Sequence, residues 1–179
     1  MSIELMDPGA DGEGAPTRVA APRLASLDGK KIGLLSNGKA NAELLVRETA
    51  ARFEEEHGCS VVHFIDKRNA GKPADPAYLA ELAAEADFLI TAVGDCGSCS
   101  TCSVHDGISF EDHQKPALVI CTHPFEPTGR NIARALGHAD YRFAMVDHPI
   151  GSRTDEEIRI RAQDAYEQGC AILTNGSGV

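Results

Sequence analysis

The sequence predicts an α/β fold: a single-domain, doubly wound, flavodoxin-like parallel sheet of about five strands with helices on both faces. Two observations lead to this class. Short apolar segments alternate with longer helical ones five times along the chain. Those short segments are apolar throughout rather than at every second position, which is typical of parallel strands covered on both faces. The expected strand order is 2-1-3-4-5.

The strand assignments rest on short apolar runs that end in turn residues. Residues 31–36 read KIGLLS and stop at Asn37-Gly38, and residues 88–93 read FLITAV and stop at Gly94. The expected strands are residues 31–36, 60–65, 88–93, 117–121 and 142–146.

The helix assignments rest on apolar spacing and on the residues at the helix ends. Ala42, Leu45 and Val46 follow a helical spacing in a segment that stops at Gly58. Acidic residues at 155–157 suit the first turn of the last helix, where the helix dipole favours negative charge. The expected helices are residues 41–57, 76–86, from 98 or 99 to about 114, 126–136 and 154–173.

Length and composition limit the possible functions of the chain. With 179 residues, the chain fits one domain at 26–179, preceded by a flexible arm at 1–25 that is rich in Gly, Ala, Pro and Asp. A net charge of -10 argues against binding to nucleic acid. The apolar runs are shorter than the roughly 20 residues of a membrane span, and residues 1–25 lack the apolar core of a signal peptide. We therefore expect a cytoplasmic protein, in which clustered cysteines indicate catalysis or metal binding.

Polar residues follow the expected strands at one edge of the sheet. In open α/β sheets, ligands bind beyond the carboxyl ends of the strands, where the winding reverses. We expect the loops there to supply substrate-binding residues, and histidines there and on the following helix to supply a general acid or base. The candidates for substrate binding are Asn37, Lys39, Asp95, Gly97, Thr122 and Glu126, and the candidates for acid–base chemistry are His105, His123 and His148.

The chemistry is expected on one segment, CGSCSTC at residues 96–102, which holds three of the six cysteines. Cys96 should lie at the tip of the loop after the third strand, where the N-terminus of the next helix favours a thiolate. Asp95 opposes this by like-charge repulsion, which a nearby Lys39 or His123 would offset. The Cys96-x-x-Cys99 spacing is that of an attacking thiolate and a resolving thiol.

Three interpretations of the segment compete. The first is a redox or nucleophilic thiol, with the pairing of Cys96 to Cys99 or to Cys102 left open. The second is a metal site of the Cys3His type for zinc, copper or iron, formed by Cys96, Cys99, Cys102 and a histidine, either His123 or His105. The third is a set of small buried hydrophobic residues, because free cysteines are often buried.

The same segment resembles a known family. The sequence is similar to the UGSC family of selenoproteins and their cysteine homologues, with Cys96 at the selenocysteine position, and more distantly to the selenoprotein B subunit of glycine reductase. The resemblance implies that the chalcogen at position 96 performs chemistry. It rests on Gly94-Asp95-Cys96-Gly97-Ser98-Cys99, Ser103-Val104-His105-Asp106, Ile120-Cys-Thr-His-Pro-Phe125, Asp147-His-Pro-Ile-Gly151 and the segment GLLSNGKAN at 33–41.

We therefore expect a thiol-based oxidoreductase that performs reductive or substitution chemistry on a small molecule. Cys96 attacks, and Cys99 or Cys102 resolves the adduct. The expected partners are the substrate, a dithiol or protein electron donor, and further subunits of a homo- or hetero-oligomer; no cofactor is favoured. Two alternatives remain: a metal-binding protein with its site at the same cysteines, and a non-catalytic subunit of a reductase complex.

Overall fold

The computed structural model describes residues 17–174. Strands and helices alternate along the chain, and the strands form one parallel sheet in the order β2-β1-β3-β4-β5. This confirms the predicted fold class and strand order. The elements are β1 (Lys31–Ser36), α1 (Ala42–His57), β2 (Ser60–Asp66), α2 (Pro76–Glu85), β3 (Phe88–Gly94), α3 (Gly97–Glu111), β4 (Ala117–Thr122), the short 3-10 helix η1 (His123–Phe125), α4 (Glu126–Ala135), β5 (Ala144–Val146) and α5 (Asp155–Leu173).

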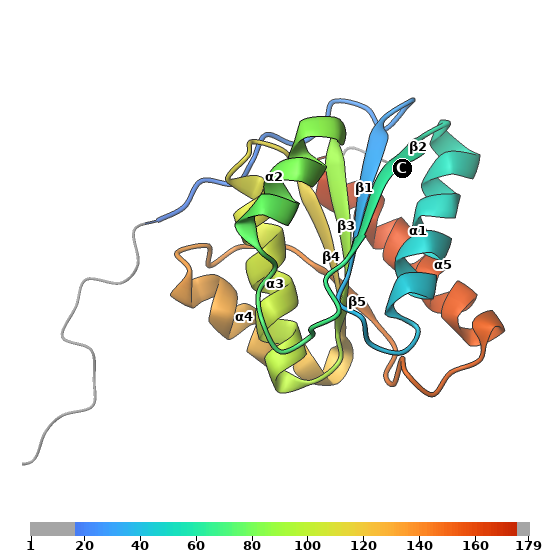
Figure 1. The fold of residues 1–179 in the computed structure, drawn as a ribbon, viewed down its shortest axis with the longest axis vertical. Coiled ribbons are helices and arrows are strands. Elements are labelled where there is room, and N and C mark those ends of the chain that lie inside the picture. The colour runs from blue at the N-terminus through green and yellow to red at the C-terminus, as the bar shows by residue number, and fades with distance from the viewer. Residues whose placement is uncertain (1–16, 175–179) are drawn as a thin grey trace, which may run out of the picture.

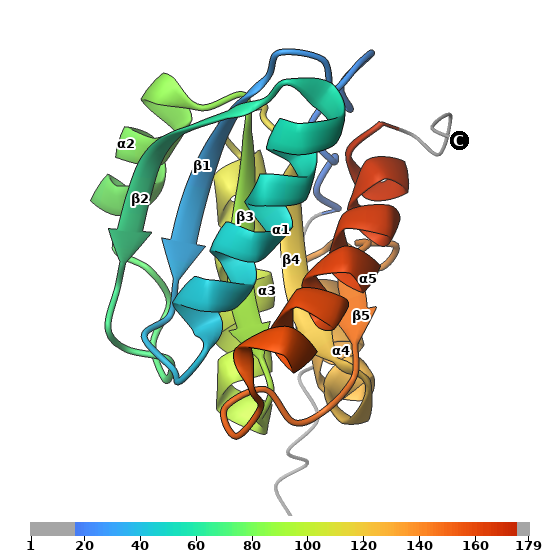
Figure 2. The same cartoon turned by 90° about the vertical axis from the view of Figure 1, so that its right-hand side faces the viewer.

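Two helical layers cover the sheet. Helices α1 and α5 pack together on one face, and α2, α3 and α4 cover the other (Figures 1 and 2). Strands β3 and β4 are buried at every position, because each lies between neighbouring strands and under both layers. The carboxyl ends of all five strands therefore point to one edge of the molecule, where the cysteine segment begins.

Two element boundaries differ from the prediction. Strand β5 starts at Ala144 rather than at residue 142, because Phe143 packs over Gly129 of α4 and the exposed Arg142 reaches the Ala171 carbonyl oxygen. Helix α3 stops at Glu111 rather than near residue 114, because Gln114 adopts a positive φ of 62° that ends the helical turn.

Residues 17–25 of the predicted arm contain no helix or strand, and they contact the domain of the same chain. The Leu24 N–H donates to the Leu173 carbonyl oxygen at 2.8 Å. Buried Glu111 accepts from the Ala21 N–H at 2.9 Å and from both terminal nitrogens of Arg23 at 2.9 and 2.7 Å. These contacts lie at the amino-terminal edge of the sheet, opposite the cysteine segment. Residues 1–16 of the predicted arm lie outside the described residues.

Candidate functional site

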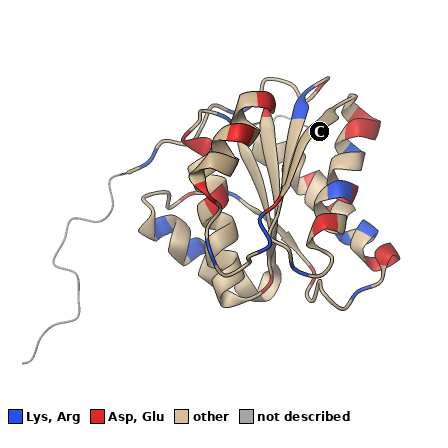
Figure 3. Cartoon of the chain, viewed as in Figure 1, with Lys and Arg blue, Asp and Glu red and all other residues tan. Residues whose placement is uncertain are grey.

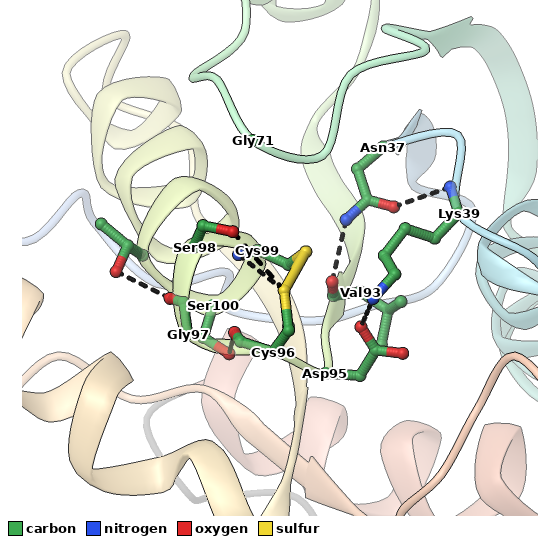
Figure 4. Close-up of a disulfide and its surroundings, with 12 residues drawn as sticks. Asn37, Lys39, Gly71, Val93, Asp95, Cys96, Gly97, Ser98, Cys99 and Ser100 are labelled. Atoms are coloured by element: carbon green, nitrogen blue, oxygen red, sulfur yellow. Dashed lines mark hydrogen bonds and ion pairs between the residues drawn. A yellow bond between two sulfur atoms is a disulfide. The ribbon is translucent and has the colours of Figure 1, made fainter.

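The disulfide between Cys96 and Cys99 lies at the start of α3 (Figure 4). Their Cα atoms are 5.2 Å apart. Cys96 caps the helix, since its Sγ accepts the Cys99 N–H at 3.2 Å. The Cys96 carbonyl oxygen accepts the Ser100 hydroxyl at 2.7 Å. The structure thus pairs Cys96 with Cys99, the pairing that the residues alone left open between Cys99 and Cys102.

The two cysteines of the disulfide differ in their exposure to solvent. Cys96 is half-buried in the loop before the helix, whereas Cys99 is only 4% exposed within the first turn. Gly97 and Ser98 between them are exposed. A small molecule therefore reaches the sulfur of Cys96 more readily than that of Cys99.

Asp95 lies beside the disulfide and forms an ion pair with Lys39. The Asp95 side chain is 7% exposed, and the Lys39 side chain is 30% exposed. A carboxylate oxygen of Asp95 and the sulfurs of Cys96 and Cys99 all lie within 4.8 Å of one another. Lys39 and His123 were both predicted to offset the charge of Asp95, and the structure pairs Asp95 with Lys39.

Asn37 joins the loops that follow β1 and β3. Its side-chain amide donates to the Val93 carbonyl oxygen at 2.8 Å, and its carbonyl oxygen accepts the Lys39 N–H at 3.2 Å. Asn37 is 2% exposed. Its side chain therefore holds the loop of Lys39 against the end of β3, a positioning role that the sequence did not suggest.

Cys102 lies one turn deeper in α3 as a free, buried cysteine. Burial raises the pKa of its thiol, and the ammonium group of Lys67 partly opposes that rise. Lys67 forms a buried ion pair with Asp106, which also accepts the Ala74 N–H at 2.7 Å. The loop between β2 and α2 is therefore tied to α3 beside the cysteines. The role of Lys67 was not predicted, because in the sequence it is indistinguishable from a solvated loop lysine.

The candidate histidines do not gather at the sulfurs. Nδ1 of His105 lies 3.4 Å from the Ser109 hydroxyl, and Nδ1 of His148 lies 3.2 Å from the Thr122 hydroxyl. His123 is exposed in η1. Among residues 17–174, the group of possible metal-ligating atoms comprises Asp95, Cys96 and Cys99, so the predicted set of three cysteines and His123 is not assembled.

Two further substrate-binding candidates have partners within the protein. The Thr122 hydroxyl donates to the Gly94 carbonyl oxygen at 3.3 Å, besides its contact with His148. Glu126 pairs with Arg130 one turn along α4, at 3.2 Å. Thr122 thus joins the ends of β3 and β4, whereas Glu126 lies on the surface of α4.

A cavity of about 450 Å³ opens beside Lys39 at the carboxyl ends of β1 and β2. Its lining carries no net charge, because the two cations, Lys39 and Arg47, are matched by the carboxylates of Glu43 and Asp66. Lys39 borders this cavity and also holds Asp95, so one side chain links the cavity to the surroundings of the disulfide. The cavity is lined by Ser36, Gly38, Lys39, Asn41, Glu43, Leu44, Arg47 and Asp66.

Comparison with known proteins identifies the family. The sequence pattern of the UGSC family matches residues 4–175, so the chain belongs to this family, as the resemblance at the cysteine segment indicated. Among the curated proteins, none matches. A solved structure with some similarity is an ABC transporter substrate binding protein from Aeropyrum pernix, at 16% identity and a TM-score of 0.35. The match covers 83% of this chain but only 37% of that protein.

Proposed function

We propose that this member of the UGSC family is a thiol–disulfide oxidoreductase that acts on a small molecule through Cys96 and Cys99. The observation that carries the proposal is the Cys96–Cys99 pair at the N-terminus of α3. Backbone N–H groups at this position stabilise a thiolate on Cys96 once the pair is reduced. The half-buried position of Cys96 and the buried position of Cys99 suit an attacking and a resolving thiol.

The proposed reaction consists of two exchanges. The Cys96 thiolate attacks one sulfur of a disulfide substrate, the substrate S–S bond breaks, and the departing half leaves as a thiolate. The Cys99 thiol then loses its proton and attacks the Cys96 sulfur, which releases the second half of the substrate as a thiolate. Two electrons pass from the cysteines to the substrate, and the products take up two protons. A dithiol or protein donor regenerates the reduced pair by the reverse exchange.

The cavity at Lys39 is the proposed substrate pocket. Its volume of about 450 Å³ falls within the range of small-molecule sites. Lys39 lines the cavity and also pairs with Asp95, the residue before Cys96, so the cavity lies next to the surroundings of the disulfide. Because its charged residues balance, the pocket favours a polar substrate that carries both donor and acceptor groups.

A second candidate function is metal binding by the reduced protein. Asp95, Cys96 and Cys99 offer three ligand atoms within 4.8 Å of one another, and three protein ligands with an open position are typical of catalytic zinc sites. The disulfide excludes this use of the sulfurs in the oxidised protein. Metal binding therefore competes with disulfide formation at the same two cysteines.

The experiment is a redox titration of the purified protein in mixtures of reduced and oxidised dithiol, with alkylation and peptide mass spectrometry at each step. We expect two thiols to appear together, at Cys96 and Cys99, and to disappear reversibly. Metal analysis of the same reduced sample separates the candidates. About one metal ion per chain, lost in Cys96→Ser and Cys99→Ser, would replace the redox proposal with the metal site.

A further inference from the structure

Two neighbouring cavities lie at the amino-terminal edge of the sheet, away from the disulfide. They form between residues 17–23 and the loop that joins α4 to β5. The Arg18 N–H holds these two segments together by donating to the Gly137 carbonyl oxygen at 2.9 Å. The smaller cavity measures about 130 Å³ and the larger about 360 Å³. His138 and Asp140 line both of them, so the two cavities adjoin.

Arginines gather at these cavities, although the chain as a whole carries a net charge of -10. Arg23 and Arg142 line the smaller cavity, and Arg18 and Arg134 line the larger one. Arg18 and Arg23 already form ion pairs with carboxylates of the protein. Within residues 17–174, Arg134 and Arg142 donate instead to an amide oxygen and a backbone carbonyl oxygen. Each cavity therefore has one guanidinium group that can take an anionic partner.

A buried nitrogen of the wall that the two cavities share lacks a partner. His138 is 9% exposed, and its Nε2 has no hydrogen-bond partner in the described part of the chain. Buried polar atoms are almost always hydrogen-bonded, so a ligand oxygen beside His138 would supply the missing partner. Asp140, the carboxylate that lines both cavities, is exposed, and solvent therefore screens its charge.

We propose that the two cavities form one binding site for a phosphate monoester of a small polar molecule. The phosphate group occupies the smaller cavity and accepts hydrogen bonds from Arg142 and from the Nε2 of His138. The rest of the molecule extends into the larger cavity beside Arg134, whose volume falls within the range of small-molecule sites. Arginine suits this ligand because the planar fork of guanidinium N–H groups matches the oxygens of a phosphate. The site is separate from the disulfide and does not depend on the proposed function.

The test is a calorimetric titration of the full-length protein at constant ionic strength with inorganic phosphate, ribose 5-phosphate and ribose. We expect saturable binding of both phosphates, tighter binding of ribose 5-phosphate, and none of ribose. Arg142→Met should weaken the binding of both phosphates by about 10-fold to 100-fold, because a charge-assisted hydrogen bond is lost. Arg134→Met should weaken ribose 5-phosphate more than inorganic phosphate. Arg52→Met is the matched control, since it removes the same charge from the surface of α1.

Nitrogen NMR of the histidine side chains supplies an independent readout. The Nε2 resonance of His138 should shift when inorganic phosphate is added, whereas that of His63, which lies between Glu81 and Glu85 on the edge strand β2, should not. An absence of saturable binding, an equal loss of affinity in Arg52→Met and Arg142→Met, or an unchanged His138 signal overturns the site. Ribose 5-phosphate that binds no tighter than inorganic phosphate overturns its assignment to a phosphate monoester.

Discussion

At the end of β3, Gly94 allows three parts of the site to approach one another. A Cβ atom at this position would lie 2.5 Å from the Cys121 sulfur and 2.9 Å from the Ser100 Cα atom. The sulfur belongs to β4 and the Cα atom to α3, so neither moves independently. The close packing of Gly94 thus sets how deeply the first turn of α3 sits above the sheet.

We predict that Gly94→Ala lowers the free energy of unfolding by about 1–3 kcal/mol, because the added methyl group overpacks this contact. Gly97→Ala is the control, since a Cβ there meets no atom within 4 Å. Denaturant unfolding of the two variants gives the comparison. Equal losses of stability at both positions would show that Gly94 is not closely packed in solution.

Cys121 should remain unreactive in the folded protein. Complete burial raises the pKa of its thiol to about 12, so below that pH the sulfur stays a neutral thiol rather than the reactive thiolate. We predict that iodoacetamide near pH 8 modifies Cys96 in the reduced native protein and leaves Cys121 unmodified. Peptide mass spectrometry after a time course measures both sites. Alkylation of Cys121 at the rate of Cys96 would contradict its burial.

At the scale of elements, α3 contributes both the cysteines and their support. Its first turn carries the disulfide, and Asp106, two turns further on, binds the loop between β2 and α2 through Lys67 and the Ala74 N–H. The side chains of Lys67 and Asp106 are 4% and 1% exposed. One helix therefore fixes the cysteines and the loop beside them together.

Removing one partner of the buried Lys67–Asp106 pair should destabilise the folded protein. We predict that Asp106→Asn lowers the free energy of unfolding by about 3–5 kcal/mol, because Lys67 keeps its buried charge without a carboxylate partner. Glu55→Gln removes a carboxylate from the exposed Arg52–Glu55 pair and should cost less than about 1 kcal/mol. Chemical denaturation of both variants tests this difference. Similar small costs would mean that Lys67 finds water or another partner.

The elements themselves were predictable because their signals are local. The apolar runs, the alternation with helical spacing, and the glycines at turns all act within a few residues, and they were enough for the fold class and for the place of Cys96 at a helix start. The strand order was taken from the usual winding of flavodoxin-like sheets. The Lys67–Asp106 pair joins residues 39 positions apart, and Asn37 reaches Val93 across 56 positions. No local pattern indicates such contacts, so these supports of the site were missed.

The predicted metal set failed to assemble for a geometric reason. Cys102 lies one helical turn below Cys99 and faces Lys67, while His123 projects from η1 into solvent. Sequence spacing placed three cysteines in one segment, but a helix distributes residues along its length as well as around it. The residue that does join the two sulfurs, Asp95, was predicted as a substrate contact and as a charge that opposes the thiolate, but not as a possible metal ligand.

At the scale of the whole molecule, the disulfide and the Arg23–Glu111 pair lie at opposite edges of the sheet. The disulfide lies beyond the carboxyl ends of the strands, and the Arg23–Glu111 pair ties the residues before β1 to the amino-terminal edge. Aspartates and glutamates are spread over both helical layers, in keeping with a net charge of -10 (Figure 3). Within residues 17–174, no helix is long and apolar enough to cross a membrane.

This separation gives a prediction for the far edge. Glu111→Gln leaves the guanidinium of Arg23, whose side chain is 13% exposed, without a charged partner, so the free energy of unfolding should fall by about 3 kcal/mol. The rate at which a dithiol reduces the Cys96–Cys99 pair should be unchanged at temperatures where the variant is folded. Thermal unfolding and alkylation kinetics measure the two properties. A large change in the reduction rate would show that the two edges are coupled.

The most direct test of the central claim is to trap the intermediate of the proposed reaction. In reduced Cys99→Ser, Cys96 should attack a small disulfide, and the adduct should persist because the resolving thiol is gone. Intact-mass and peptide mass spectrometry locate the added group. The account predicts one stable mixed disulfide at Cys96 in Cys99→Ser, and no adduct at residue 96 or 99 when the two cysteines are intact and free to close. A variant that forms no adduct at Cys96, or an unaltered protein that holds the adduct as long as Cys99→Ser does, would contradict it.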